Sequence, residues 1–207
     1  MIYSDSDLNT LRQSVSRLLS KKRFMHTLGV EKSALELGSY FLPECISELR
    51  AAALLHDIAK ELSEDQINDL ISLFNFTFND NEIIVPEAHH SFIAPLVIKR
   101  DFPTYATDSI LSSVYSHTIC SSVFDTFDLI IFISDFVEDG RIYESCIKTR
   151  QYLFDNLSLE NSYEENLKIL YTACILSIDY TEKLLKTRGK TLHPITEIAK
   201  KKLISLI

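Results

Sequence analysis

The segment AALLHDIAK, residues 52–60, places a histidine, an aspartate and a lysine at the end of an apolar run. On a helix, His56 shares a face with apolar residues three, four and seven positions earlier, so its ring is expected to point inward. Asp57 needs a partner there, because burying an unpaired carboxylate costs several kcal/mol. Imidazole and carboxylate together are ligands for ions such as iron, manganese and zinc. Lys60 lies one turn further on and is expected over the same spot, where a phosphate between it and a metal would relieve their repulsion.

Other groups of the same chemistry lie far away in the sequence. His117 shares a predicted helical face with Ile110 and Val114, and Asp135 lies in the apolar run LIIFISDFV. Each group has a simpler interpretation when taken alone: a single histidine on an apolar face is more often a hydrogen-bonded core residue, and a lysine that ends a helix usually stays solvated. The carboxylates favour a shared cation, because both must be paired when buried.

Helices must bring these groups together, since most of the chain has an apolar period near 3.6 residues. LIIFISDFV is expected to be a helix because no second β-like run is present to pair with it. Residues 75–88 are expected to form a loop. A first helix is predicted after a cap at Ser4 or Ser6, a second over 24–41 and a third from about Glu44. A fourth is predicted to follow the capping box Ser63–Gln66. Further helices are predicted over 89–101, 104–118, 126–138, 142–157 and 163–187. The expected fold is a single all-α domain over residues 1–207.

The composition restricts the class of protein and its possible partners. With 207 residues, 46% hydrophobic residues and a net charge of −8, the chain is expected to be globular and to avoid nucleic acid as a partner, while a small anionic ligand can still bind in a local positive pocket. No apolar run approaches the ~20 residues of a membrane span, and the first residues lack the pattern of a secretory signal, so we expect a cytoplasmic protein with no membrane partner. Four glycines form no phosphate-binding loop or dinucleotide fingerprint, and four scattered cysteines are expected to be buried thiols.

Five sequence blocks resemble, in order and spacing, the YqeK family of bacterial HD-domain hydrolases, which cleave diadenosine tetraphosphate symmetrically into two ADP. The blocks are RFMHTLGVEKSALEL, AALLHDIAKE, PEAHHSFIAPLVI, YSHTICS and ISDFVEDGR. The resemblance covers residues 20 to 145 and implies a compact HD-domain helical bundle for this part, with residues 146–207 packed on it. TLHPITEIAKKKL, near the end of the chain, extends the likeness.

The resemblance also implies roles for particular residues. The metal ligands would be His26, His56, Asp57 and Asp135, with iron the expected ion, another transition metal such as manganese the substitute, and a second ion left open. The catalytic group would comprise Asp57, Lys60, His90, His117 and Arg141. The nucleotide and its phosphates would be contacted by Lys60, His90, His117, Thr118 and Arg141.

The chain departs from the family pattern in places that bear on the substrate. HTICSSVFDTFD has no glycine-containing turn after His-Thr, Ser134 precedes Asp135, and VEDGR replaces a proline-containing sequence. Metal-activated water acting on a dinucleoside tetraphosphate is the expected chemistry. Hydrolysis of a nucleoside mono- or triphosphate and a non-catalytic nucleotide-binding protein stay open as alternatives, as does a homodimer.

Several neighbours of the expected ligands have two interpretations. His90 and His117 would orient water, donate to phosphate or complete a second metal site. His89 is expected to be an ordinary surface or loop residue. Glu138 is expected either to support a ligand or to be exposed, and Gly29 to let a neighbouring helix approach the metal. Arg188, Lys190 and His193 are either solvated or close over the ligand.

Overall fold

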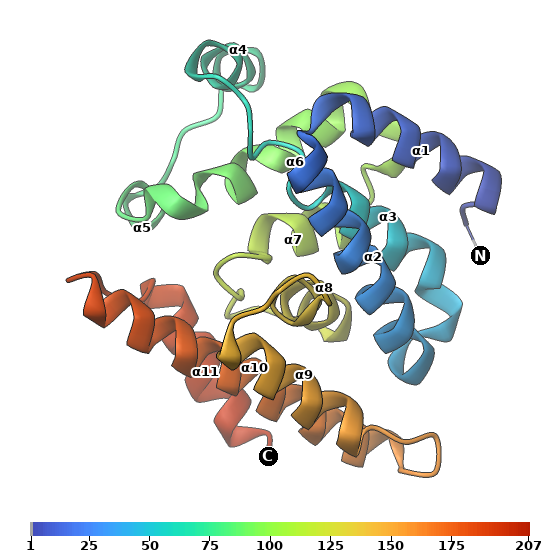
Figure 1. Cartoon of the computed structure of the whole chain (residues 1–207). Helices are drawn as coiled ribbons and strands as arrows, with labels where there is room; N and C mark the ends of the chain where they lie inside the picture. Colours follow the sequence, from blue (N-terminus) through green and yellow to red (C-terminus); the bar gives the residue numbers. More distant parts are fainter. Residues whose placement is uncertain (1) are drawn as a thin grey trace.

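The computed structural model describes residues 2–207 and contains no strand in that range (Figure 1). The prediction of an all-α fold is therefore confirmed. None of the helices in this range has the length and apolar character needed to cross a membrane. The α-helices are α1 (Asp5–Leu18), α2 (Lys21–Phe41), α3 (Ile46–Leu55), α4 (Glu64–Phe74), α5 (Asp80–Ile83), α6 (His89–Asp101), α7 (Asp108–Ser116), α8 (Thr126–Val137), α9 (Glu144–Asn156), α10 (Tyr163–Thr187) and α11 (Pro194–Ser205).

Side-chain caps set several of the helix starts. Ser4 and Asp7 form a capping box before α1, and Ser63 and Gln66 form the predicted box before α4. Helix α2 begins at Lys21, earlier than expected, because the hydroxyl of Ser20 accepts the backbone N–H of Arg23. These local hydrogen bonds fix the direction in which each helix enters the core.

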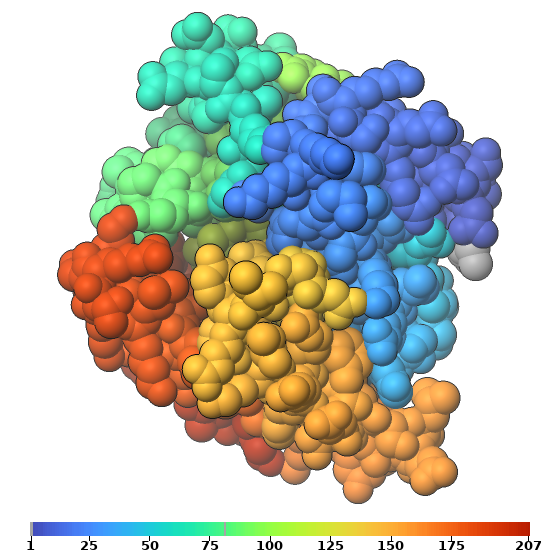
Figure 2. Space-filling view, viewed as in Figure 1, coloured from blue at the N-terminus to red at the C-terminus, as the bar shows by residue number. Residues whose placement is uncertain are grey.

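Helix α8 lies at the centre of the bundle, where it packs against α2, α3, α7, α9 and α10. Its Leu129, Ile130, Ile131 and Ile133 are buried, as expected for a helix surrounded by others. Helices α1–α3 lie on one side of it and α9–α11 on the other (Figure 1). Figure 2 shows the blue, green and yellow-to-red segments meeting on one face of the molecule. The end of α8 that carries Asp135 is thus held from several directions.

Three segments differ from the sequence-based expectation. The expected loop 75–88 contains α5 and a 3-10 turn over Pro86–Ala88. Helix α7 begins at Asp108, because Pro103–Tyr105 forms a separate 3-10 turn and Thr107 caps the helix. Helix α11 was not predicted. It starts where His193 caps its N-terminus and Pro194 occupies the first turn, which are ordinary start signals in a short, lysine-rich sequence.

Candidate metal centre

Helix ends converge on one cluster of imidazole and carboxylate groups. His26 comes from α2, His56 and Asp57 from the end of α3, and Asp135 from the last turn of α8. The first turn of α6 and the end of α7 add His90 and His117. These six residues form three overlapping groups, in each of which the ligand atoms lie within 4.8 Å of one another: His26, His56 and Asp57; His56, His117 and Asp135; and Asp57, His90 and His117.

The rings of His56 and His117 are held by the same local arrangement. Each residue is the C-cap of its helix, and each Nδ1 donates to the carbonyl three residues earlier, at 2.7 Å to Ala53 and 2.6 Å to Val114. Carbonyls in the last turn lack helical partners, so they are free to accept these bonds. Nδ1 is therefore a donor in both rings, and each Nε2 faces the cluster.

Asp57 divides the histidines between its two oxygens. Its Oδ2 lies 3.4 Å from His56 Nε2 and 3.7 Å from His26 Nε2, whereas its Oδ1 lies 3.3 Å from His90 Nε2 and 3.6 Å from His117 Nε2. The side chain of Asp57 is only 4% exposed. Asp57 is therefore a member of two of the three ligand groups, with a different pair of histidines in each.

His26 lies between two carboxylates. Its Nε2 is 3.0 Å from Asp135 Oδ1, and its Nδ1 is 3.1 Å from Glu138 Oε1. Burial alone would lower its pKa, but the two carboxylates raise the pKa of His26 to about 9. Glu138 is buried and so belongs to the site, which resolves the alternative left by the sequence. Gly29 permits this contact, because a Cβ at that position would collide with the Glu138 carboxylate.

Three cationic side chains contact members of the cluster. Arg23 Nη1 donates to Asp57 Oδ2 at 2.8 Å, and Arg141 Nη2 donates to Asp135 Oδ1 at 2.5 Å while its Nε donates to the Asp135 carbonyl at 3.0 Å. Lys60 Nζ lies 3.1 Å from the ring nitrogens of His90, and burial lowers the pKa of this lysine. Arg141 thus uses two nitrogens to hold Asp135, which limits its availability for the phosphate contact that the resemblance implies.

The donor set fits a metal ion. Burial would raise the pKa values of Asp57 and Asp135. For Asp57, the electrostatic interaction with His56 and hydrogen bonds with imidazoles hold the pKa well below its usual range. For Asp135, mainly the Arg141 charge has the same effect on the pKa. Burial lowers the pKa of His90 to about 4. The Nε2 atom of His56 is buried and has no hydrogen-bond partner. Carboxylates and imidazoles gathered in this way form a ligand set that fits a transition-metal cation.

Sequence reasoning missed two arginines. Arg23 lies one turn before His26 on the same helical face, which is the only local signal for it. Arg150 on α9 donates from Nη1 to the carbonyls of Val137 and Glu138 and from Nη2 to that of Arg141. It therefore fixes the turn after α8 that carries Glu138 and Arg141.

The remaining predicted residues lie at the edge of the cluster. Thr118 is exposed, and its Oγ1 is 3.2 Å from His90 Nε2. His89 differs from the expectation of a surface or loop residue, because it is half-buried in α6, with Nε2 3.1 Å from the Glu82 carbonyl and its ring stacked on Phe78 at 4.5 Å. His89 is therefore a packing residue beside the ligand set.

Two known proteins have sequences similar to this chain. The "Bis(5'-nucleosyl)-tetraphosphatase, symmetrical" of Bacillus subtilis is 23% identical over 193 residues, which cover 92% of this chain and 94% of the relative. The "Probable nicotinate-nucleotide adenylyltransferase/Ap4A hydrolase" of Mycoplasma pneumoniae is 23% identical over 176 residues, covering 85% of this chain and 47% of the relative.

A solved structure has a similar fold. The crystal structure of a "predicted HD superfamily hydrolase involved in NAD metabolism" from Clostridium acetobutylicum matches with a TM-score of 0.78 and 24% identity, covering 95% of this chain and 96% of that one. The HD domain family model matches residues 23–138, which include every one of the six clustered imidazole and carboxylate residues. On the strength of that match and of the histidine–aspartate cluster within it, this chain belongs to the HD domain family.

Proposed function

We propose that this HD-domain protein hydrolyses diadenosine tetraphosphate symmetrically to two ADP, with a transition metal, iron or manganese, as its cofactor. The observation that carries the proposal is Asp57, whose two oxygens face different pairs of histidines, with Arg23 and Lys60 beside them. Phosphoryl transfer depends mainly on positioning and on neutralising charge, and this arrangement supplies both.

In the proposal His26, His56, Asp57 and Asp135 hold one metal. A bound transition metal would lower the pKa of a coordinated water and polarise a phosphoryl oxygen. His90 and His117 face the other oxygen of Asp57, so they are the residues for a second ion. Glu138 accepts a hydrogen bond from His26 Nδ1, so Nε2 is the ring atom of His26 that would ligate the metal.

Basic side chains bind the phosphate chain. Lys60 is the side chain best placed for a direct phosphate contact, because its Nζ lies beside the His90 ring and forms no ion pair with Asp57 or Asp135. Arg23 and Arg141 keep the carboxylates oriented, and their charges also favour a polyphosphate. An open hollow of about 670 Å³ lined by Lys60, His90 and Glu87 gives the phosphates a path to the centre.

The relatives support this choice of substrate. Two of them carry names that specify Ap4A or bis(5'-nucleosyl)-tetraphosphate hydrolysis, and the Bacillus subtilis protein aligns over nearly its whole length. The small-molecule substrate class, the nucleotide contacts at Lys60, His90, His117, Thr118 and Arg141, and a cytoplasmic location are parts of the same proposal.

Product analysis tests the proposal. The purified protein, loaded with iron or manganese, is incubated with diadenosine tetraphosphate, and the nucleotides are separated by chromatography. We expect only ADP, and we expect Asp57→Asn to abolish its formation. Formation of ATP plus AMP contradicts the symmetric reaction. A parallel panel of nucleoside mono- and triphosphates shows whether turnover of another nucleotide is faster, which would overturn the choice of substrate.

A further inference from the structure

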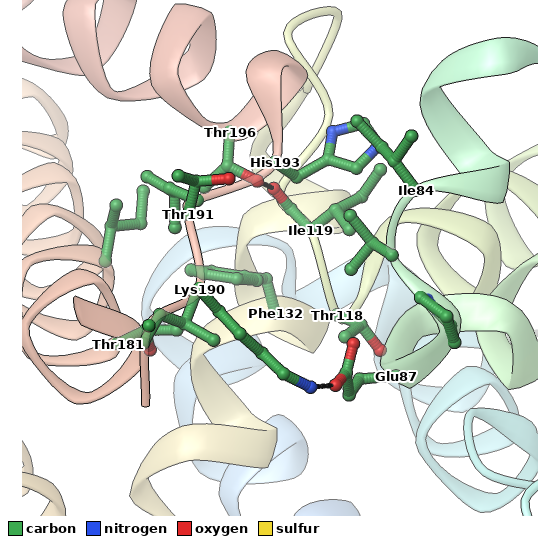
Figure 3. Close-up of a pocket in the computed structure, with 16 residues that line it drawn as sticks. Ile84, Glu87, Thr118, Ile119, Phe132, Thr181, Lys190, Thr191, His193 and Thr196 are labelled. Atoms are coloured by element: carbon green, nitrogen blue, oxygen red, sulfur yellow. Dashed lines mark hydrogen bonds and ion pairs between the residues drawn. The ribbon is translucent and has the colours of Figure 1, made fainter. Parts of the chain in front are cut away.

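A cavity of about 420 Å³ lies beside the metal centre. Of the proposed metal-binding, catalytic and nucleotide-contacting residues, only Thr118 lines it. Figure 3 shows that four parts of the chain enclose it: the segment around Ile84 and Glu87, the residues Thr118 and Ile119 after α7, Phe132 on α8, and the stretch from α10 to the start of α11. Its size is that of a small-molecule site.

The walls of the cavity are mainly apolar, with a few hydroxyl groups. Ile119, Phe132, Ile178 and Leu192 provide aliphatic and aromatic surface. Hydroxyl groups come from Thr118, Thr181, Thr191 and Thr196. A flat heteroaromatic ring suits such a cavity, because its faces contact aromatic and aliphatic side chains while its edge accepts and donates hydrogen bonds.

Thr118 joins the cavity to the metal centre. It lines the cavity, and its Oγ1 lies 3.2 Å from His90 Nε2, which in turn is 3.3 Å from Asp57 Oδ1. A ligand whose ring occupies the cavity can therefore direct an attached phosphate past Thr118 to the metal ligands. Glu87 and Lys190 form an ion pair at the boundary, so the segment before α6 is linked to the segment before α11 (Figure 3).

The C-terminal segment gives the cavity its fixed shape. The hydroxyl of Thr196 donates to the carbonyl of Ile119, which ties α11 to the residues after His117. His193 is buried and caps α11, with Nδ1 accepting the backbone N–H of Ile195 at 3.1 Å. Leu192 is also buried. The end of the chain is thus packed against the residues that lead into the metal centre.

We propose that this cavity binds one nucleoside moiety of the substrate, a purine base with its ribose, while the phosphate chain extends past Thr118 toward His90 and Lys60. The assignment of a phosphate-linked ligand rests on the proposed phosphohydrolase function. The apolar walls and the pairing of the nearby lysine with Glu87 favour a neutral ring over a phosphate inside the cavity.

Thr181→Phe is the main test, because Thr181 lies on α10, lines the cavity and is only half-buried. The matched control is Leu184→Phe, on the same helix, 50% exposed and outside the cavity lining. Calorimetric titrations of the metal-loaded protein use ADP and inorganic pyrophosphate as probes. We expect Thr181→Phe to weaken ADP binding at least tenfold and to leave pyrophosphate binding unchanged, whereas Leu184→Phe changes neither.

A second variant keeps the test decisive if Thr181→Phe does not fold. Thr191→Trp adds bulk from the exposed segment before α11, and circular dichroism and metal content identify the variants that are folded and loaded. If folded Thr181→Phe and Thr191→Trp bind ADP as tightly as the unmodified protein, the cavity is not the nucleoside site, even if diadenosine tetraphosphate is cleaved. Equal affinity of the unmodified protein for ADP and pyrophosphate overturns the proposal too. Loss of ADP binding in the variants supports the cavity site, even where tetraphosphate cleavage is absent and the proposed function fails.

Discussion

The Glu138 carboxylate orients the ring of His26 through its contact with Nδ1. Its Oε1 lies 3.1 Å from His26 Nδ1, and its Oε2 accepts the backbone N–H of Gly140 at 2.6 Å. Partners of this kind commonly change metal affinity about 10- to 100-fold when they are mutated. We predict that Glu138→Gln weakens metal binding by roughly tenfold or more, measured by competition with a chromophoric chelator. Asp139→Asn, at an exposed neighbouring carboxylate, should bind metal normally, and an unchanged affinity in Glu138→Gln would contradict the role assigned here.

Gly29 provides the space for that carboxylate. Replacing a helix-interior glycine with alanine normally stabilises a helix by up to about 1 kcal/mol. Here the new methyl group would meet Glu138 and displace it from His26. We therefore predict that Gly29→Ala binds metal more weakly although its helix propensity improves, and that Gly29→Ala/Glu138→Gln is hardly weaker than either single variant. Additive losses in a chelator competition would show that the two residues act separately.

The apolar patterns around His56, His117 and Asp135 were enough to predict inward-facing polar groups, and the family resemblance supplied His26 and His90. The contacts of Arg23, Glu138 and Arg150 could not be predicted in the same way, because their partners lie 34, 112 and 12 or 13 residues away. The sequence around each of these residues contains no signal for a hydrogen-bond partner so far away in the chain. Only the packing of α2, α3, α8 and α9 brings them within hydrogen-bonding range.

At the scale of elements, capping residues were the most informative signals. Ser63 and Gln66 predicted the start of α4, and the apolar run of α8 was predicted as a helix because it had no β partner. Helix α11 was missed because its apolar positions are sparse, and it is buried only at Thr196, Ala199 and Leu203. A short helix of this kind is stabilised mainly by its contact with α10, which periodicity alone does not reveal.

Asp128, in the first turn of α8, lowers the stability of the folded state by an amount that depends on pH. Burial and the neighbouring Asp125 raise the pKa of Asp128 to about 6, whereas an unfolded aspartate titrates near 4. The folded state therefore holds this proton more tightly, so stability falls as pH rises from about 4 to about 6 and the penalty, roughly 3 kcal/mol at most, is complete above that range.

Asp128→Asn removes this penalty and retains an oxygen that can accept the Asp125 N–H, as Asp128 now does at 3.3 Å. We predict that the variant is more stable than the unmodified protein at pH 7 and that the difference disappears at pH 4. Denaturant unfolding at several pH values measures it. Asp108→Asn, at an exposed position in the first turn of α7, should show no such gain. A difference that is constant with pH would rule out ionisation as its cause.

Across the whole molecule, the C-terminal helices are continuous with the rest of the core. Helix α10 packs against α2 and α8 as well as α9 and α11, so this one helix contacts both the helices of the metal centre and the other C-terminal helices. Leu170, on α10, belongs to the same apolar cluster as Leu54 on α3 and Ile131 on α8. We propose on this basis that residues 1–207 form one cooperative domain.

Leu170→Ala tests this proposal at a residue that is fully buried and is not among the clustered ligands. Removing a buried leucine side chain typically costs about 2–5 kcal/mol. In one cooperative unit, that loss lowers the opening free energy of the slowest-exchanging amides of α3 and α10 equally, and hydrogen exchange followed by mass spectrometry resolves both helices. Leu184→Ala, on the exposed side of α10, should change both by less than about 0.5 kcal/mol. Faster exchange in α10 with unchanged exchange in α3 would instead mean that the C-terminal helices unfold on their own, and that the nucleoside cavity and the metal centre belong to separate folding units.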